Sequence, residues 1–200
     1  GEIVSIDCGV RFNEWCADAA ITVPVGVIDS QRIELLEVTE AILALAIRMI
    51  RPGRRWSEIA SALQAMTFDA GFGIVEQYCG HGIGRQLHEP PAVPCVMTRS
   101  LMGRGDFTLQ RGMILAIEPI LALEAPALRA DGTASGVPTF IGEDGWTVRT
   151  LMGEITSHFE HTIAVGPRYA EILTTNMANA DMGMHPARIS FDAVNTGSAC

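Results

Sequence analysis

The alternation of apolar and polar residues predicts a β-hairpin at the start of the chain. Residues 2–10 alternate and are rich in Ile and Val, and a second apolar run covers residues 15–25. The residues between the two runs, 11–14, are predicted to form the turn. Side chains two positions apart on such strands share one face of the hairpin.

Two helices are predicted to follow the hairpin. Asp29 offers an N-cap to a segment whose apolar residues recur at helical spacing, and Pro52 ends this segment. A second helix is predicted over residues 57–70 and is closed by Gly71.

The rest of the chain is predicted to form short antiparallel strands, which makes the fold α+β rather than a series of βαβ units. Residues 121–144 contain several Gly and Pro residues and are predicted to be a long surface excursion. Residues 175–200 show little periodicity and are predicted to be a loosely ordered C-terminal tail, which leaves one domain over residues 1–174. The predicted strands lie around residues 73–78, 113–118, 146–150, 158–165 and 171–174.

Composition narrows the class of protein. The chain has 200 residues, of which 48% are hydrophobic, so it can bury a core, but no apolar run is long enough to span a membrane. A net charge of −9 argues against direct nucleic-acid binding, which needs clustered Lys and Arg. The five cysteines form no C-x-x-C pair, and scattered thiols suit a reducing compartment, so we expect a cytoplasmic protein.

Five potential metal ligands are spread along the chain, each in a short apolar or glycine-bounded segment. Four carboxylates and one imidazole suit a pair of divalent ions about 3.5–4 Å apart, with a shared water as nucleophile. Such a ligand set accepts Co, Mn, Fe or Zn. The candidate ligands are Asp7, Asp18, His81, Glu118 and Glu160.

Three of these carboxylates also have a simpler structural interpretation. Asp7 and Asp18 lie on the two predicted strands of the hairpin, where they can converge, but they could also be edge or turn residues. Glu160 could pair locally with His158 or His161 instead of binding a metal. These alternatives stay open at the level of the sequence.

Two histidines flank a glycine-rich turn. His81 has a glycine on each side, and glycine allows the backbone to approach closely enough to bring an imidazole to a metal. His88 follows shortly after, and the pair favours a site over two unrelated structural histidines. Glu118 ends an apolar strand, where an unpaired carboxylate would be costly and a cation is the simplest partner.

Several short segments occur together in an arrangement typical of one known family. They are residues 1–7, Ala17-Asp18, Y-C-G-H-G-I-G-R at residues 78–85, residues 111–119, D-G-W-T-V at residues 144–148 and F-E-H-T at residues 159–162. In combination they resemble a type I methionine aminopeptidase. The resemblance runs from residue 1 to about residue 174 and implies a pita-bread (creatinase/aminopeptidase) fold, in which helices cover a curved antiparallel sheet.

The resemblance also implies roles for individual residues. Asp18 and Glu160 would bridge two divalent ions that Asp7, His81 and Glu118 also hold. Glu118 would be the proton shuttle while a metal-activated water attacks the first peptide carbonyl. Three further residues would contact the substrate: His88 near the scissile bond, and Trp146 and Leu87 in the methionine pocket. Leu87 stands where family members often carry an aromatic residue.

The expected activity is removal of the N-terminal methionine from nascent proteins whose second residue is small. The partners implied are nascent N-terminal peptides near the ribosome, and we expect a monomer that binds neither nucleic acid nor membranes. Asp7 lies near the middle of a family member, so we expect an N-terminally incomplete fold and weak activity of these residues alone. Two alternatives stay open: an Xaa-Pro aminopeptidase of the same fold and a non-catalytic pita-bread binding protein.

Overall fold

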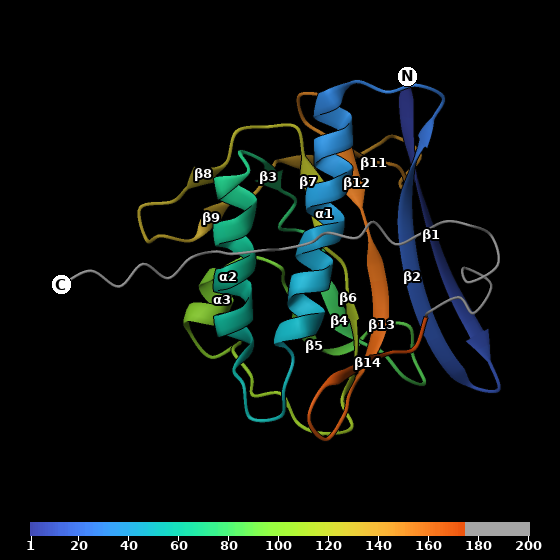
Figure 1. The fold of residues 1–200 in the computed structure, drawn as a ribbon, viewed down its shortest axis with the longest axis vertical. Helices are drawn as coiled ribbons and strands as arrows, with labels where there is room; N and C mark the ends of the chain where they lie inside the picture. Colours follow the sequence, from blue (N-terminus) through green and yellow to red (C-terminus); the bar gives the residue numbers. More distant parts are fainter. Residues whose placement is uncertain (175–200) are drawn as a thin grey trace.

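An antiparallel, curved sheet with two long helices on one face dominates the structure (Figure 1). The computed structural model describes residues 1–174, and the predicted tail, 175–200, lies outside the described residues. The main sheet has the order β1-β2-β13-β6-β4-β5, and β14 also pairs with β13. Its strands are β1 (Glu2–Phe12), β2 (Trp15–Val25), β13 (Glu160–Val165), β6 (Ile114–Ile117), β4 (Gly80–Gly82), β5 (Glu89–Val93) and β14 (Ala170–Ile172).

Smaller sheets and three helices complete the described fold. One small sheet has the order β12-β7-β3, and two others are the pairs β10-β11 and β8-β9. All strand pairs among the described residues are antiparallel, which confirms the predicted α+β class. The remaining elements are α1 (Ser30–Met49), α2 (Trp56–Asp69), α3 (Arg99–Met102), β3 (Gly73–Ile74), β7 (Ile120–Ala122), β8 (Ala127–Leu128), β9 (Ala134–Ser135), β10 (Thr139–Ile141), β11 (Val148–Thr150) and β12 (Thr156–His158).

The hairpin turn is tighter than the sequence predicted. Only Asn13 and Glu14 form it, with φ angles of 46° and 69°, because a two-residue turn with positive φ matches the twist of paired strands. Arg11 and Phe12 belong to β1 instead of the predicted turn. The hairpin prediction itself is confirmed.

Both predicted helices are present. The Asp29 side chain caps α1 by accepting a 2.8 Å hydrogen bond from the Arg32 backbone N–H, as the sequence indicated. Helix α2 begins one residue earlier than predicted, at Trp56, whose indole Nε1 donates to the Pro94 carbonyl at 2.9 Å. This bond satisfies the polar atom of a fully buried ring.

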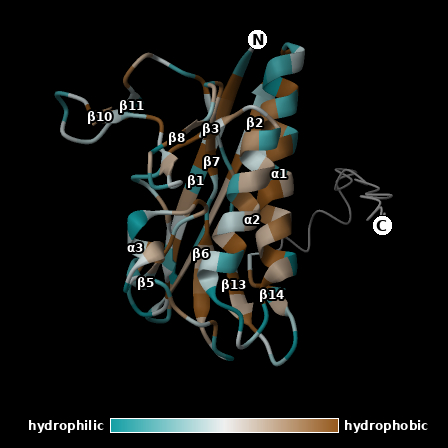
Figure 2. Cartoon of the chain, turned by 90° about the vertical axis from the view of Figure 1, so that its left-hand side faces the viewer, coloured by the Kyte–Doolittle hydropathy of each residue, from teal (hydrophilic) through white to brown (hydrophobic). Residues whose placement is uncertain are grey.

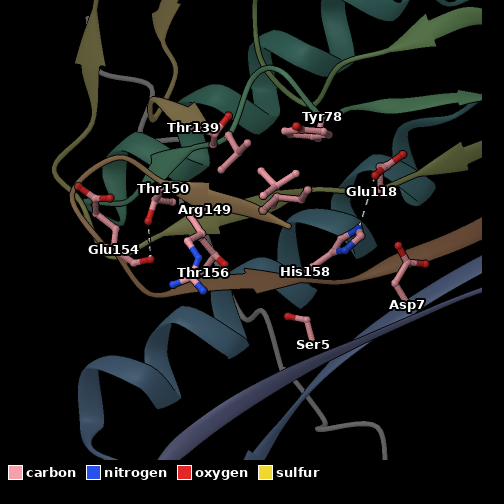
Figure 3. Close-up of a pocket in the computed structure, with 14 residues that line it drawn as sticks. Ser5, Asp7, Tyr78, Glu118, Thr139, Arg149, Thr150, Glu154, Thr156 and His158 are labelled. Carbon is pink, nitrogen blue, oxygen red and sulfur yellow. Dashed lines mark hydrogen bonds and ion pairs between the residues drawn. The ribbon is translucent and has the colours of Figure 1, made fainter. Parts of the chain in front are cut away.

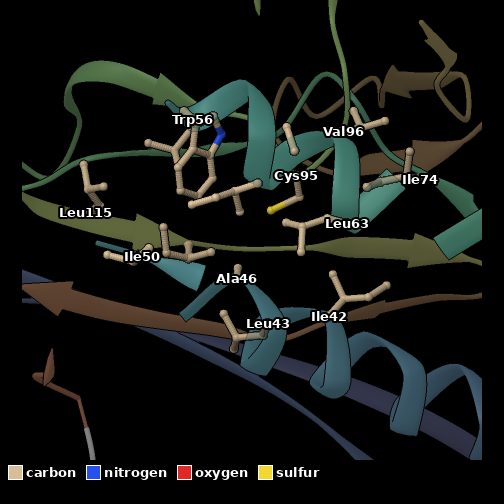
Figure 4. Close-up of a cluster of buried hydrophobic side chains, with 14 of the residues drawn as sticks. Ile42, Leu43, Ala46, Ile50, Trp56, Leu63, Ile74, Cys95, Val96 and Leu115 are labelled. Atoms are coloured by element: carbon tan, nitrogen blue, oxygen red, sulfur yellow. The ribbon is translucent and has the colours of Figure 1, made fainter. Parts of the chain in front are cut away.

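The main core lies between the two long helices and the sheet (Figure 4). This core includes Ile42 and Ala46 of α1, Leu63 of α2 and Leu115 of β6, all of them buried. Figure 2 shows apolar residues gathered along the sides of the helices and strands that face one another. Burial of apolar side chains therefore fixes the helices to one face of the sheet. The other face of the sheet is not covered by these two helices.

The prediction of a surface excursion over residues 121–144 is partly wrong. Leu121 and Ala122 form β7 and are fully buried, and Ala134 is buried as well. The Gly and Pro residues in this segment lie between short strands instead of marking one continuous loop. The sequence also gave no signal for the short elements α3, β4, β5, β8, β9, β10 and β12 as separate units.

No helix within residues 1–174 is long and apolar enough to cross a membrane.

Glycines allow unusually close packing around β4. A Cβ on Gly80 would lie 2.3 Å from the Ala116 carbonyl oxygen, and one on Gly82 would lie 2.2 Å from the Pro90 carbonyl oxygen. Neither glycine has a positive φ, so the requirement is for space rather than for an unusual backbone angle. Close approach of β5 and β6 to β4 therefore depends on both residues.

We expect Gly80→Ala to lower the thermal unfolding midpoint, because backbone atoms of β6 cannot move aside for the added methyl group. Overpacking of this kind typically costs about 1–3 kcal/mol. Gly84→Ala is the matched control, since a Cβ there would meet the flexible Glu89 side chain, with its nearest oxygen at 3.1 Å. Equal unfolding midpoints for the two variants would show that the close contact at Gly80 is unimportant.

Candidate metal centre

The register of the main sheet places the predicted ligands on one face. Asp7 is paired with Ala20 and Asp18 with Gly9, so the two aspartates lie on the same face of the hairpin but diagonally, not directly opposite. Glu160 is also paired with Ala20, from the other side of β2. These three carboxylates therefore point to the same side of the sheet.

The histidine reaches this face through β6. His81 of β4 is paired with Ala116, which is also paired with Thr162, two residues after Glu160 on β13. Glu118 follows two residues after Ala116, just beyond the end of β6. Strands β1, β2, β13 and β4 therefore each carry one candidate ligand, and Glu118 follows β6.

Three of the predicted ligands converge closely. Ligand atoms of Asp18, His81 and Glu160 all lie within 4.8 Å of one another, and the three residues are 7%, 7% and 2% exposed. Glu118 adjoins them, with its Oε1 atom 3.6 Å from Nε2 of His81. Asp7 is on the more exposed β1 and lines the cleft beside Glu118.

The His81 ring is held in an orientation that suits a metal ligand. Its Nδ1 atom lies 2.9 Å from the Gly82 carbonyl oxygen, which can only accept, so Nδ1 carries the proton. The Nε2 lone pair is then free and directed toward Glu118. Ligating histidines commonly donate their other ring N–H to a carbonyl in this way.

Burial and mutual repulsion destabilise the charged form of the carboxylates in the cluster, which favours binding of a cation. Burial, followed by repulsion from Glu118, Asp18 and Asp7, raises the pKa of Glu160 to about 9. Burial and the charge of Asp7 also raise the pKa of Asp18, and Glu118 adds to this shift while His81 opposes it. The Oε1 atom of Glu160 is buried and has no hydrogen-bond partner among residues 1–174. A divalent ion would satisfy this atom and neutralise the repulsion, so the residues fit a metal centre.

Thr162 holds two of the strands together beneath the cluster. Its hydroxyl donates to the Asp18 carbonyl at 2.8 Å and accepts from the Asp18 backbone N–H at 2.9 Å. These buried bonds fix the backbone of Asp18 relative to the strand that carries Glu160. The sequence analysis did not single out Thr162, although it lies in the F-E-H-T segment.

A cleft of about 550 Å³ opens beside the ligands (Figure 3). Asp7 and Glu118 lie at one end, and Arg149 and Glu154 lie toward the other. The lining is mixed, with apolar side chains beside polar ones. Among the lining residues are Ser5, Val75, Tyr78, Ile120, Val148 and His158.

The predicted substrate contacts lie at different distances from this centre. The His88 ring centroid is 4.3 Å from that of His81, so His88 adjoins the cluster. Leu87 packs over Gly9, because its Cδ1 atom is 3.2 Å from the place that a Cβ there would take. Trp146 is 86% exposed and is not part of the cleft lining, so its contact with the substrate stays a prediction.

Comparison with known proteins identifies the family. The sequence pattern of metallopeptidase family M24 matches residues 1–167. The chain belongs to this family. The methionine aminopeptidase of Treponema pallidum is 39% identical over 174 residues, and methionine aminopeptidase 1 of Bacillus subtilis is 38% identical over 174 residues.

Solved structures of M24 relatives confirm the predicted pita-bread fold. A crystal structure of methionine aminopeptidase from Thermotoga maritima is 39% identical and superimposes with a TM-score of 0.75 over 87% of this chain. The prolidase from Pyrococcus furiosus is 21% identical with a TM-score of 0.62, which shows the common fold alone.

The M24 chain is shorter than the relatives that it matches. The matches cover 87% of this chain but 63% of the Treponema pallidum protein and 64% of the Bacillus subtilis protein. The Thermotoga maritima structure is likewise covered over 64% of its length.

The raised pKa of Glu160 predicts that the metal-free protein loses stability as the pH rises. Between 4.5, the ordinary value for glutamate, and about 9, the folded protein keeps a proton that the unfolded chain releases. Unfolding then releases a proton, so the free energy of unfolding falls across this window.

Urea unfolding of metal-free protein at several pH values in this window measures the effect. Glu160→Gln, which cannot ionise, should flatten the dependence. A slope that is the same in the variant and in the original chain would show that other groups cause it.

Proposed function

We propose that this M24 chain carries the metal centre of an aminopeptidase that removes N-terminal methionine when the second residue is small. The convergence of Asp18, His81 and Glu160 beside a cleft carries the proposal. The names of the curated relatives support the choice of methionine aminopeptidase within the family. Its substrates would be N-terminal peptides of nascent proteins, met in the cytoplasm near the ribosome by a monomeric enzyme.

Asp7, Asp18, His81, Glu118 and Glu160 would hold two divalent ions, chosen from Co, Mn, Fe and Zn. Such ions, when bound, lower the pKa of water and polarise a carbonyl group. The fold of the chain would determine where the ions are held. Three buried candidate ligands on strands β2, β13 and β4 of one sheet leave little freedom for the centre to shift, and catalysis depends strongly on such positioning.

Two residues would act on the substrate directly. Glu118 faces both the ligand cluster and the cleft, so its carboxylate can take a proton from the attacking water and pass it to the leaving amine. His88 lies beside His81 and could donate a hydrogen bond to the carbonyl oxygen as negative charge develops there. Both roles require the peptide to enter with its first carbonyl at the cluster.

The apolar part of the cleft suits a methionine side chain. Val75, Tyr78 and Ile120 line it on one side, and Val148 contributes from β11. A thioether chain is flexible and adapts to an irregular apolar surface of this kind. The predicted contributions of Leu87 and Trp146 would add to this surface if the substrate or a longer chain draws them closer.

Release of methionine from the tripeptide Met-Ala-Ser should depend on added metal and stop after dialysis against a chelator. The reason is that the clustered carboxylates cannot activate water without a cation. The peptide Ala-Pro-Ser is the comparison substrate, and faster release of its alanine would favour an Xaa-Pro aminopeptidase. Metal binding without release from either peptide would favour a binding protein, and unchanged release by metal-free protein would rule out the mechanism.

Substitution Glu118→Gln should lower kcat by about 10²–10⁴-fold with a small change in KM, because a positioned proton shuttle acts mainly in the transition state. Glu34→Gln, on the exposed side of α1, is the matched control for the change of charge. Metal content is measured in both variants. An effect limited to KM would assign Glu118 to substrate binding, and loss of metal would assign it to the centre alone.

A further inference from the structure

His158 is a buried histidine whose outer ring nitrogen lies between two ligand carboxylates. Its Nε2 atom is 3.6 Å from Oε2 of Glu118 (Figure 3). The same atom is 4.0 Å from Oε2 of Glu160. Both distances exceed those of hydrogen bonds, about 2.7–3.2 Å. Within the described part of the chain, Nε2 has no hydrogen-bond partner, although it is shielded from solvent. A buried polar atom in this state requires an explanation.

Glu118 stands between two imidazoles. Its Oε1 atom faces Nε2 of His81, and its Oε2 atom faces Nε2 of His158, each at 3.6 Å. When one oxygen of a carboxylate binds a metal, the other is commonly held by a hydrogen bond from a neighbouring group. His158 is placed to supply that bond.

The backbone of His158 is fixed independently of its ring. The Thr22 hydroxyl donates to the His158 carbonyl and accepts from the His158 N–H, both at 2.8 Å. This pair of hydrogen bonds between β2 and β12 holds His158 beside the hairpin that carries Asp7 and Asp18. The 3.6 Å separation of Nε2 from Oε2 of Glu118 exceeds the upper limit of a hydrogen bond, about 3.2 Å, by only about 0.4 Å.

A direct metal ligand is the other possible role, and the ring contacts argue against it. His81 has the second bond typical of a ligating histidine, from Nδ1 to the Gly82 carbonyl, whereas no hydrogen bond from Nδ1 of His158 occurs within residues 1–174. The closely spaced ligand group likewise consists of Asp18, His81 and Glu160 without His158.

We propose that His158 is a positioning residue of the metal centre, which donates Nε2–H to Oε2 of Glu118. The bond would hold the carboxylate with Oε1 toward His81 and so keep one ligand in place. This inference rests on the proposed function only in requiring that the cluster binds a metal. It assigns His158 a role that does not depend on the identity of the peptide substrate.

The test compares His158→Ala with His158→Gln, because the glutamine amide can still donate a hydrogen bond. Titration calorimetry with Mn²⁺ measures metal affinity, and the visible absorption of Co²⁺-loaded protein reports the ligands. We expect His158→Ala to weaken metal binding about 10–100-fold, as is typical for removal of an outer hydrogen-bond partner. We expect His158→Gln to bind within a few-fold of the original chain and to keep its Co²⁺ spectrum.

His161→Gln is the matched control. His161 lies on the same segment, but its Nδ1 atom is 2.9 Å from the Thr174 hydroxyl, and it lines a separate pocket with Leu43 of α1. Its substitution should leave metal affinity unchanged. If His158→Ala does not fold, His158→Leu fills the space without a donor and takes its place.

Two results would overturn the proposal. Equal loss of affinity in His158→Gln and His158→Ala, with an altered Co²⁺ spectrum in both, would make His158 a direct ligand. Unchanged affinity in both would show that it does not position Glu118. Failure of the original chain to release methionine while it binds metal would instead count against the proposed function and would leave the test of His158 intact.

Discussion

Repulsion among buried carboxylates is the constraint on which the rest of this structure depends. Glu160 and Asp18 are almost fully buried, and the nearby charges of Asp7 and Glu118 raise the pKa values of Glu160 and Asp18. Without a cation, such a cluster is tolerated only if protons remain bound or the surrounding structure is firm enough to hold it. The hydrogen bonds of Thr162 to the Asp18 backbone and the close packing at Gly80 and Gly82 hold the surrounding strands in place.

The antiparallel sheet explains how residues far apart in the sequence form one centre. Pairing of β2, β13, β6 and β4 in spatial order brings segments from both ends of the described chain together. The period of two along each strand then directs Asp18, Glu160 and His81 to one face. Helices α1 and α2 bury the opposite face, so apolar packing and metal chemistry are separated by the thickness of one sheet.

The long elements could be predicted from the sequence and candidate ligands could be named, because both leave strong local signals. Asp29 marked the start of α1, alternation marked the hairpin, and a carboxylate at the end of an apolar strand marked Glu118. Short strands such as β4 and β12 left no such signal, since their residues are defined by partners distant in sequence. The role proposed for His158 had no local signal for the same reason, because its neighbour Glu118 lies just beyond β6, far away in the sequence.

The two-residue turn at Asn13 and Glu14 connects local chain geometry with the metal centre. It fixes the register that pairs Asp7 with Ala20, and a shift of one residue would turn Asp7 toward the other face. That other face carries Val4, Ile6, Val10 and Phe12, all substantially exposed in residues 1–174, and a carboxylate there would be far from the remaining ligands. The apolar alternation along β1 and the position of its aspartate therefore specify the same register.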